Sequence, residues 1–466
     1  MRGVLYICYQ STTEPLTQTQ VVPYLEGLVA DRDSTNAGSL SEGTESCGAL
    51  RIVLLTFEPC ALEREEQQAW REKLAQRGIE WQWVRYHKRP RLPATAWDIL
   101  VGCWTAWCIM RRYDKKARNW ILHARGHVPG VIAFLLKRWT GARFLFDIRG
   151  FLAEEYADAG ILKPNGFVYR TVKRWERRLV GAADALVVLT WKAKELLVAW
   201  YPDEVRGKPI EVIPCCVDLR GDGWRGNKNG EELGVRGEEA IIGRARAQRS
   251  KRRTALNLVY VGKLGGWYLT EEMVRFIAIA REIVPGLRWQ VWTQSDRSIL
   301  DTALERYGIE DGVSVGKILP EGLLDRLREA DAGLVFDGRC LSAAGVFPTK
   351  IGEYLAAGLP VVVNAGIGDV DELILGPDGP RKSWGLSDSV RPRVRKGRVG
   401  VVLYEFSEEA YREAVYALLD LLAEPGIRER CRETARRHLD LCDVGWARYR
   451  SVYARLMQDG RNGVIE

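Results

Sequence analysis

The stretch 345-GVFPTKIGEYLAAGLPVVVN-364 has the pattern of a helix followed directly by a buried strand. Pro348 fits the first turn of a helix, where a missing backbone N–H costs no hydrogen bond. Gly358 fits the end of the same helix, where a left-handed residue is common. The apolar run 360–363 then fits a buried strand. A helix that leads directly into a buried strand is typical of a parallel α/β sheet.

The same alternation continues over nearly the whole sequence. In the first half we expect strands at 4–9, 51–56, 79–84, 121–124, 143–147 and 185–189, each followed by a helical segment. In the second half we expect them at 257–261, 288–292, 312–315, 333–336, 360–363 and 399–403. The predicted fold class is α/β, with two facing Rossmann-like domains and a cleft between them.

The predicted boundaries divide the chain into four parts. Residues 1–215 form an N-terminal Rossmann-like domain, and residues 257–440 form a second one. A linker at 216–256 carries a basic insertion rich in Gly and Arg, and 441–466 form a C-terminal helix that packs back towards the first domain. Two further polar insertions, 31–48 and 376–397, are expected to form surface loops.

The composition is that of a soluble globular protein. The chain has 466 residues, of which 46% are hydrophobic and 28% charged, enough for two domains with cores of their own. The net charge of +8 suits phosphate-bearing ligands or an anionic surface better than nucleic acid, because no zinc-finger, RRM or KH signature occurs. Ten cysteines form no CxxC pair, so no zinc or redox motif is expected. The N-terminal apolar run is too short for a signal peptide, and the uncharged stretch 99–110 is shorter than the roughly 20 residues of a membrane span, so we expect a cytoplasmic protein.

The helix after Pro348 carries residues suited to a phosphate-bearing ligand. Its N-terminus lies at the carboxyl ends of the strands, where open α/β sheets bind ligands, and its free N–H groups favour an anion. Thr349 adds a hydroxyl donor and Lys350 a positive charge, and Glu353 can accept hydrogen bonds from a ribose diol. A capped helix with solvated Lys and Glu side chains is the alternative.

Residues 345–364 resemble the donor-nucleotide motif of the retaining GT-B glycosyltransferases of family 4. That motif reads Glu-Gly-Phe-Pro, then a second Glu on the helix, then Ala-x-Gly-x-Pro-Val-Val. Glu353 matches the second Glu, which in that family holds the ribose. Gly345 stands in place of the first Glu, so that contact to the donor sugar is missing here. The Pro-Thr-Lys form is similar to a sub-group in which Thr and Lys face the diphosphate.

The loop 260–267, Tyr-Val-Gly-Lys-Leu-Gly-Gly-Trp, resembles the Gly-Arg-Leu loop that receives the donor phosphates in this family. Lys263 replaces the Arg, Gly262 precedes it, and Gly265 and Gly266 let the backbone approach a diphosphate closely. The family's second Lys is not evident a few residues further on. A Gly-rich turn with an exposed Lys is the alternative.

The first domain supplies the candidates for the catalytic cleft. Residues 146–151, Phe-Asp-Ile-Arg-Gly-Phe, occupy the place of the family's Asp-x-His-Asp stretch. Arg149 stands where His is common, and because Arg cannot act as a base it would stabilise phosphate or developing negative charge. A structural pair of Asp147 and Arg149 is the alternative.

The acceptor side is expected around the loop 11–18, which resembles the family's Gly-rich acceptor loop. Its candidate sugar-binding residues are Thr13, Glu14, Thr17 and Gln18, although an ordinary strand-to-helix turn would carry the same residues. Asp147 and His127 complete the acceptor-side set. His123 and His127 flank Arg125 in the manner of the family's His-Ala-His stretches, and we rank His127 above His123.

The resemblance implies transfer of a sugar from a nucleotide-sugar donor, UDP- or GDP-linked, to a glycan or lipid-linked acceptor with retention of anomeric configuration. The expected catalytic residues are Arg149, Lys350 and Lys263. No metal and no cofactor besides the nucleotide-sugar co-substrate is expected, because the two lysines and the helix N-terminus can stabilise the departing diphosphate. The DxD triplets at 31–33 and 369–371 are attributed to chance.

Two other functions remain open. A sugar-nucleotide 2-epimerase of the same architecture would keep the nucleotide site and use carboxylates and His for proton transfer. A non-catalytic nucleotide-sugar-binding subunit would fit the departures at Gly345 and Arg149. The sequence lacks GxGxxG after the first strand, GxxxxGK[ST] and GxSxG, which argues against a dehydrogenase, a P-loop NTPase and an α/β-hydrolase.

A basic helix predicts peripheral contact with the inner face of the cell membrane. Between 168 and 180 the apolar and basic residues recur on separate faces, the first being Val168, Val172, Trp175 and Leu179 and the second Arg170, Lys173, Arg174, Arg177 and Arg178. We expect the apolar face to pack on the sheet and the basic face to meet anionic lipid, with Trp104 and Trp107 of 99–110 adding an interfacial contact. A solvated helix face or a pocket for an anionic acceptor is the alternative.

Overall fold

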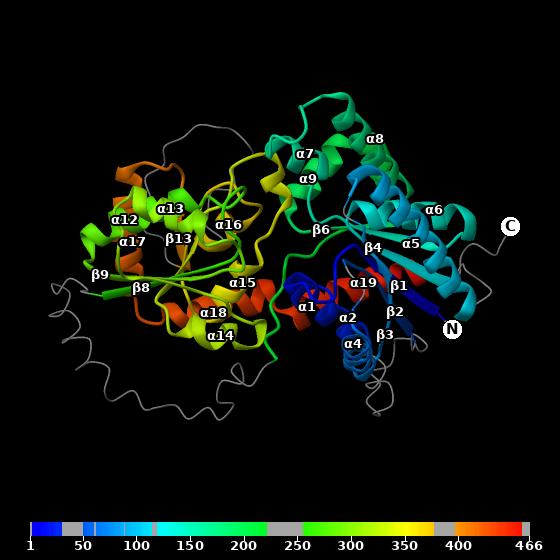
Figure 1. Ribbon diagram of the computed structural model, residues 1–466, viewed down its shortest axis with the longest axis horizontal. Coiled ribbons are helices and arrows are strands. Elements are labelled where there is room, and N and C mark those ends of the chain that lie inside the picture. Colours follow the sequence, from blue (N-terminus) through cyan, green and yellow to red (C-terminus); the bar gives the residue numbers. More distant parts are fainter. Residues whose placement is uncertain are drawn as a thin grey trace. The chain divides into compact units, whose positions relative to one another are not determined.

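The computed structural model describes residues 2–29, 50–59, 62–87, 89–113, 119–220, 255–376 and 397–458. It divides into two units. Unit 1 comprises Met1–Val217, Cys340–Pro348 and Leu439–Glu466, and unit 2 comprises Asp218–Arg339 and Thr349–His438. Each unit is built on one parallel sheet covered by helices, so the predicted α/β class is confirmed (Figure 1). Most of the expected linker, most of both polar insertions and the triplet at 31–33 lie outside the described residues.

The sheet of unit 1 has seven parallel strands in the order β3-β2-β1-β4-β5-β6-β7. The strands are β1 Arg2–Cys8, β2 Leu50–Glu58, β3 Ile79–Arg85, β4 Trp120–Arg125, β5 Arg143–Asp147, β6 Ala185–Val188 and β7 Ile210–Val212. The helices are α1 Pro15–Gln20, α2 Val22–Val29, α4 Arg64–Gln76, α5 Arg91–Tyr113, α6 His127–Thr140, α7 Leu152–Asp158, α8 Phe167–Ala182, α9 Trp191–Trp200, α10 Pro202–Val205, η2 Leu341–Gly345, η3 Leu441–Trp446 and α19 Ala447–Gln458.

Side chains of β1 alternate between two hydrophobic cores, as the period of a strand requires. Leu5 and Ile7 share a core with side chains of α5, α6, α8 and α9. Val4 and Tyr6 share the other core with side chains of α2, α4 and α19. The sheet is therefore buried on both faces, and its strand ends are held rigidly.

The sheet of unit 2 has six parallel strands in the order β10-β9-β8-β11-β12-β13. The strands are β8 Ala255–Val261, β9 Gly286–Trp292, β10 Val313–Gly316, β11 Ala332–Val335, β12 Val361–Asn364 and β13 Gly400–Leu403. The helices are α12 Thr270–Ile283, α13 Ser298–Arg306, α14 Pro320–Arg328, α15 Thr349–Ala356, α16 Val370–Leu375, α17 Glu408–Leu422 and α18 Ile427–Leu439. Gly358 follows α15 with φ of +80°, the left-handed conformation expected at that helix end.

The segment Cys340–Pro348 differs from the predicted division, because it belongs to unit 1. The backbone N–H and the hydroxyl of Ser342 donate to Asp158 Oδ2 at 3.0 and 2.6 Å. The hydroxyl of Thr190 donates to the Ala344 carbonyl at 2.5 Å. These bonds tie the segment to α7 and α9, so the chain enters α15 from an anchored position.

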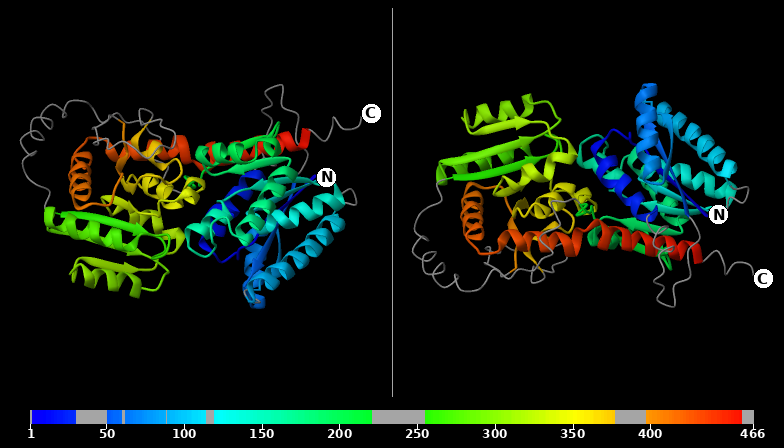
Figure 2. Two further views of the ribbon diagram at one scale, coloured as in Figure 1. Left: turned by 90° about the horizontal axis from the view of Figure 1, so that it is seen from above. Right: turned by 90° about the horizontal axis from the view of Figure 1, so that it is seen from below.

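The C-terminal segment also belongs to unit 1. The indole N–H of Trp446 donates to the Pro23 carbonyl at 2.9 Å, and Arg450 donates to the Gly27 carbonyl at 2.8 Å. Figure 2 shows the red end of the chain returning to the blue elements where the sequence begins. Helix α19 thereby completes one face of the first sheet.

Helix α5 is longer than the uncharged stretch 99–110 suggested. Among the described residues, Leu92–Tyr113 is the one helix long and apolar enough to cross a membrane by length and composition, with a mean hydropathy of 1.2. Its Cys103, Ala106 and Met110 lie in the core of unit 1. Its buried Asp98 accepts a hydrogen bond from the Tyr9 hydroxyl at 2.7 Å. These contacts make α5 a core helix of unit 1.

Candidate functional site

The loop after β8 carries the three glycines expected to approach a diphosphate. Gly262, Gly265 and Gly266 have φ values of +148°, +74° and +60°, in the region that favours glycine. The N–H of Gly265 donates to Thr270 Oγ1 at 2.9 Å, and the N–H of Leu264 donates to Ser295 Oγ at 3.0 Å. The loop is therefore fixed by side chains of its own unit.

Lys350 lies on α15, in its first turn, and its side chain is buried against this loop. Lys350 is only 6% exposed to solvent. The ammonium lies 4.8 Å from the ring centroid of Tyr260 and 4.7 Å from that of Tyr268. A Cβ placed on Gly262 would lie 3.5 Å from the ammonium, so the glycine leaves this space open. The two rings attract the cation and hold it at the carboxyl end of β8.

Asp337 is the counterion of Lys350, and the sequence analysis did not identify it. Its Oδ1 lies 3.4 Å from Lys350 Nζ. Burial raises the pKa of the Asp337 carboxyl, and the charge of Lys350 opposes this rise. The backbone around Asp337 is fixed by Asn364 at the end of β12, which accepts from the Asp337 N–H at 2.9 Å and donates to its carbonyl at 3.0 Å. Among the described residues, Asp337 is the carboxylate that pairs with this buried cation.

Glu353 lies on the same helix as Lys350, one turn later. Burial raises its pKa to about 7, and the charge of Lys350 opposes the rise. The residue keeps some exposure to solvent, so a ligand can reach it. The site thus combines a buried cation with a carboxyl group that changes charge near neutral pH.

The remaining donor-side residues lie close to Lys350 in the chain. Thr349 is the first residue of α15, and the buried Pro348 immediately precedes it. Lys263 is exposed, and its carbonyl accepts from the Tyr260 hydroxyl. Its ammonium has no ion pair with a described residue, so it stays available to an incoming phosphate.

Gly345, which replaces the family's first Glu, packs inside unit 1. A Cβ at this position would lie 3.0 Å from the ring of Phe151. This is tighter than an ordinary van der Waals contact, so a Glu here would require Phe151 to move. The packing of η2 against Phe151 therefore favours glycine over glutamate at this position.

The acceptor-side loop of unit 1 is held by a residue that the sequence analysis missed, Glu58 at the end of β2. Glu58 is fully buried and accepts from the Thr12 N–H at 3.0 Å, from the Thr12 hydroxyl at 3.2 Å and from the Ser11 hydroxyl. The N–H of Thr13 donates to Ser11 Oγ at 3.1 Å. Sequence reasoning had no signal for Glu58 except a charge at the end of an apolar strand.

The other predicted loop residues differ in exposure. Thr17 is buried in α1, and its hydroxyl has no partner among the described residues. Gln18 donates to the Thr13 carbonyl at 3.3 Å. Glu14 is exposed and accepts from Gln10 at 3.3 Å. Thr13, Glu14 and Gln18 are thus the members of this set that a ligand can reach most easily.

Asp147 and Arg149 form the ion pair that the sequence analysis offered as the structural alternative. Arg149 Nη2 lies 2.9 Å from Asp147 Oδ2, and the Tyr449 hydroxyl of α19 donates to the same oxygen at 3.0 Å. Burial would raise the pKa of Asp147, but Arg149 and His123 outweigh it and hold the pKa well below its usual range. Asp147 Oδ1 and Arg149 Nη1 are buried and have no hydrogen-bond partner among the described residues. The pair fastens α19 to the sheet and leaves two polar atoms unsatisfied.

The two histidines lie in separate networks. His123 lies between the Tyr453 hydroxyl, 2.5 Å from Nδ1, and Asp147, 3.3 Å from Nε2. Burial lowers the pKa of His123, against the opposing effect of Asp147. His127 Nε2 lies 3.1 Å from the buried Glu176 of α8. The structure therefore does not bring His127 and Asp147 together into one hydrogen-bonded cluster.

Four of the five basic residues predicted on one face of α8, Arg170, Arg174, Arg177 and Arg178, are exposed, but Lys173 is not. Lys173 turns inward and pairs with Glu154 at 3.0 Å and Glu176 at 2.6 Å. Arg177 pairs with Glu204. The expected apolar face is also incomplete, because Leu179 is buried whereas Val168 is 48% exposed. Carboxylates of α7, of α10 and of α8 itself neutralise part of this charge.

These two units define a class of protein, the GT-B fold with two Rossmann-like domains. Residues 34–216 match the family model described as Glycosyl transferase 4-like domain. A search of curated proteins gives no match. Among the described residues, no group of three or more His, Cys, Asp and Glu could hold a metal ion.

Solved structures of similar fold cover nearly the whole chain. Sucrose-phosphate synthase from Thermosynechococcus elongatus matches with a TM-score of 0.64 at 13% identity, over 98% of this chain and 100% of that chain. Anabaena HepE in complex with UDP-glucose matches with a TM-score of 0.57 at 12% identity, over 97% and 100%. A variant of S. aureus TarM in complex with fondaparinux, alpha-GlcNAc-glycerol and UDP matches with a TM-score of 0.60 at 8% identity, over 98% and 100%. The chain thus has the fold of the GT-B glycosyltransferases, and residues 34–216 are similar to the glycosyl transferase 4-like domain.

Proposed function

We propose that the chain is a retaining glycosyltransferase of the family 4 type, which moves a sugar from a UDP- or GDP-sugar to a glycan or lipid-linked acceptor without a bound divalent metal. The observation that carries the proposal is the position of Lys350. Its ammonium is buried at the carboxyl ends of β8 and β11, between two tyrosine rings and beside Asp337. Such a cation is suited to a diphosphate, because a charge in a desolvated site acts more strongly than in water.

Lys350 would act mainly when the glycosidic bond to the diphosphate breaks. Negative charge then grows on the leaving oxygens, and a preorganised cation stabilises it more than it stabilises the bound donor. The first N–H groups of α15 and the exposed Lys263 would bind the same phosphates. Departure and attack on one face of the sugar require no covalent nucleophile.

Glu353 would bind the ribose of the donor nucleotide. Its ionised carboxylate can accept two hydroxyl groups, as a ribose diol supplies. The contact is the same in the ground state and the transition state, so it would contribute to donor affinity more than to the chemical step. The HepE complex holds UDP-glucose and the TarM complex holds UDP, so UDP-sugars are the first donors to test.

A sugar-nucleotide 2-epimerase is the second candidate, because the pKa values of both Asp337 and Glu353 are raised. A carboxyl group with a pKa near 7 suits proton transfer. Product analysis separates the two activities. An epimerase changes the donor without releasing nucleotide, whereas a transferase releases one nucleotide for each sugar transferred.

The experiment is an NMR analysis of products from UDP- and GDP-sugars in the presence of EDTA. We expect nucleotide release and a product with the anomeric configuration of the donor. An inverted anomer, or activity that appears only when Mn²⁺ is restored, would contradict the mechanism. Epimerised donor without nucleotide release would favour the second candidate.

We also propose that unit 1 contacts an anionic membrane face from the cytoplasmic side, through α5. The exposed residues of α5 include Trp97, Leu100 and Trp104, which are 57, 62 and 65% exposed and recur at helical spacing. Arg111 and Arg112 follow in the last turn. Tryptophan rings flanked by Arg are typical of surfaces that lie in a membrane interface.

Vesicle co-sedimentation tests this contact. Binding should rise with the fraction of anionic lipid and fall when Leu100 and Trp104 are both changed to Ser. The matched control changes Leu319, an exposed residue of unit 2, to Ser. Equal sedimentation of the α5 variant and the wild type would refute the role of α5.

A further inference from the structure

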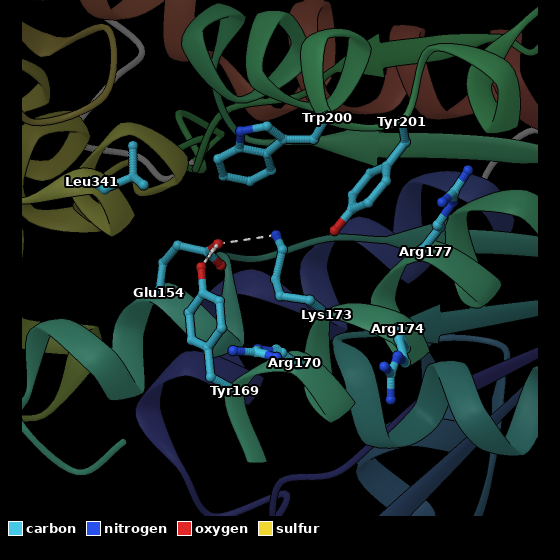
Figure 3. A pocket seen from close by; sticks show the side chains of 9 residues that line it. All are labelled: Glu154, Tyr169, Arg170, Lys173, Arg174, Arg177, Trp200, Tyr201 and Leu341. Atoms are coloured by element: carbon cyan, nitrogen blue, oxygen red, sulfur yellow. Dashed lines mark hydrogen bonds and ion pairs between the residues drawn. The ribbon is translucent and has the colours of Figure 1, made fainter. Parts of the chain in front are cut away.

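A pocket lies within unit 1, and none of its lining residues belongs to the candidate site around Lys350. It has a volume of about 500 Å³. Its lining residues come from α7, α8, the end of α9 and the start of η2, and they are Glu154, Tyr169, Arg170, Lys173, Arg174, Arg177, Trp200, Tyr201 and Leu341. Figure 3 shows Trp200 and Tyr201 on one side of the pocket and Tyr169 with Arg170 on the other. A pocket of this size accommodates a small ligand.

The interior of the pocket holds a carboxylate with an unused oxygen. Glu154 is 3% exposed. Its Oε1 receives the Tyr169 hydroxyl at 3.0 Å and the Lys173 ammonium at 3.0 Å. Its Oε2 is buried and has no hydrogen-bond partner among the described residues. Because an unsatisfied buried acceptor costs free energy, a small shift of Glu154 that brings this oxygen to a ligand hydroxyl would be favoured.

Lys173 lines the pocket, but its positive charge is neutralised by neighbouring carboxylates. Its ammonium bridges Glu154 and Glu176 and lies 3.9 Å from the ring centroid of Trp200. Glu176 also accepts from the Tyr201 hydroxyl at 2.7 Å. This network positions the half-buried ring of Trp200, whose apolar surface suits the ring of a carbohydrate.

The rim of the pocket is cationic. Arg170 and Arg174 are both exposed and lie one turn apart on α8. Arg170 donates to the Asn165 carbonyl at 2.7 Å, and neither arginine pairs with a carboxylate among the described residues. Arg177, in contrast, is paired with Glu204. The rim therefore carries two guanidinium groups that can bind a phosphate or carboxylate in a bidentate manner.

We propose that this pocket binds the anionic part of a carbohydrate acceptor, a phosphorylated or acidic sugar. The hydroxyl groups of the sugar would donate to Glu154, its ring would lie against Trp200, and its anionic group would meet Arg170 and Arg174. That the bound sugar is an acceptor rests on the proposed transferase function. The binding of an anionic sugar to this pocket does not depend on it. A free sugar phosphate and the phosphate-bearing sugar of a lipid-linked acceptor share this chemistry.

The test is isothermal titration of the full chain with glucose 6-phosphate, glucuronate, glucose and inorganic phosphate. We expect at least one anionic sugar to bind more tightly than both glucose and inorganic phosphate. In an Arg170→Gln/Arg174→Gln double variant its affinity should fall about tenfold, because two charge-assisted contacts are lost. The matched control is Arg178→Gln, which removes an exposed arginine of the same helix outside the pocket and should leave the affinity unchanged.

Three results would overturn the inference. One is the absence of heat with any anionic sugar up to millimolar concentration. Another is equal affinity in the double variant and the Arg178→Gln control. The third is a double variant that loses sedimentation with phosphatidylglycerol vesicles while no soluble anionic sugar binds the wild type, since the arginines would then serve a lipid surface. UDP binding, measured in the same proteins, should not change in the double variant, and its absence from the wild type would refute the donor site independently.

Discussion

The pKa of Glu353 predicts that donor binding depends on pH around neutrality. With a pKa of about 7, about a tenth of this carboxyl is ionised at pH 6 and about nine tenths at pH 8. A ribose diol donates its hydrogen bonds, and bonds to an ionised acceptor are about twice as strong as neutral ones. The diphosphate diester of a nucleotide sugar does not change its charge in this range. The dissociation constant for UDP-glucose should therefore fall by up to about tenfold between pH 6 and pH 8.

Glu353→Gln tests this reasoning, because the amide keeps the shape of the side chain and does not titrate. Titration calorimetry with UDP-glucose at pH 6, 7 and 8, at constant ionic strength, should give a nearly constant affinity for this variant. Glu310→Gln, which changes an exposed carboxyl of unit 2, should keep the pH dependence of the wild type. The same slope in Glu353→Gln as in the wild type would show that another group titrates.

The same shift has a consequence for stability with a definite sign. The folded pKa of about 7 lies above the ordinary value of 4.5, so the folded state holds the extra proton between these two pH values. The free energy of unfolding should therefore fall as pH rises from 4.5 to 7, by at most about 3 kcal/mol from this group. The wild type minus Glu353→Gln difference in urea unfolding isolates this contribution from Asp337, whose raised pKa acts in the same direction.

Three further changes test other parts of the account. Lys350→Ala should lower kcat about 10²–10³-fold with a smaller change in the donor KM, whereas Glu353→Ala should mainly raise KM; steady-state kinetics that match the wild type in both would refute the site assignment. Asp147→Asn should lower the free energy of unfolding by about 3–5 kcal/mol in urea, because Arg149 and its neighbour Arg125 lose their buried counterion; an unchanged midpoint would contradict that role. Gly262→Ala should weaken UDP-glucose binding at least about fivefold, since its Cβ would lie 3.1 Å from the Tyr260 hydroxyl in a strained backbone, while Gly322→Ala, with open space around it, should bind normally.

The fold could be predicted from the sequence because both sheets are parallel and buried. Strands such as β6 Ala185–Val188 and β12 Val361–Asn364 are buried at every position, so each appears in the sequence as an unbroken apolar run. The placement of Cys340–Pro348 in unit 1 could not be predicted, because it depends on single bonds such as Ser342 to Asp158, 184 residues apart. Sequence periodicity carries no information about such long-range pairs.

The candidate site could be predicted only in part, for a related reason. Lys350 and Glu353 belong to a motif, but Asp337 is a single carboxylate after a strand and becomes recognisable only beside Lys350. Helix α8 shows the same limit of prediction from sequence. Its spacing correctly predicted cations on one face, yet the carboxylates that neutralise Lys173 and Arg177 come from α7, α8 itself and α10. The local sequence pattern predicts on which face of a helix a charged side chain lies. Which residue it pairs with depends on tertiary packing.

Titration of the full chain with UDP-, GDP-, ADP- and CMP-sugars in EDTA tests whether unit 2 binds a nucleotide-sugar donor. The account predicts that a UDP- or GDP-sugar binds with one site per chain, and that Glu353→Ala at pH 8 weakens this binding at least about tenfold, whereas Glu310→Ala does not. A bound donor should also raise the melting temperature, because it stabilises only the folded state. Failure of all four sugars to bind, or equal binding to the wild type and Glu353→Ala, would contradict the donor site built around Lys350 and Glu353.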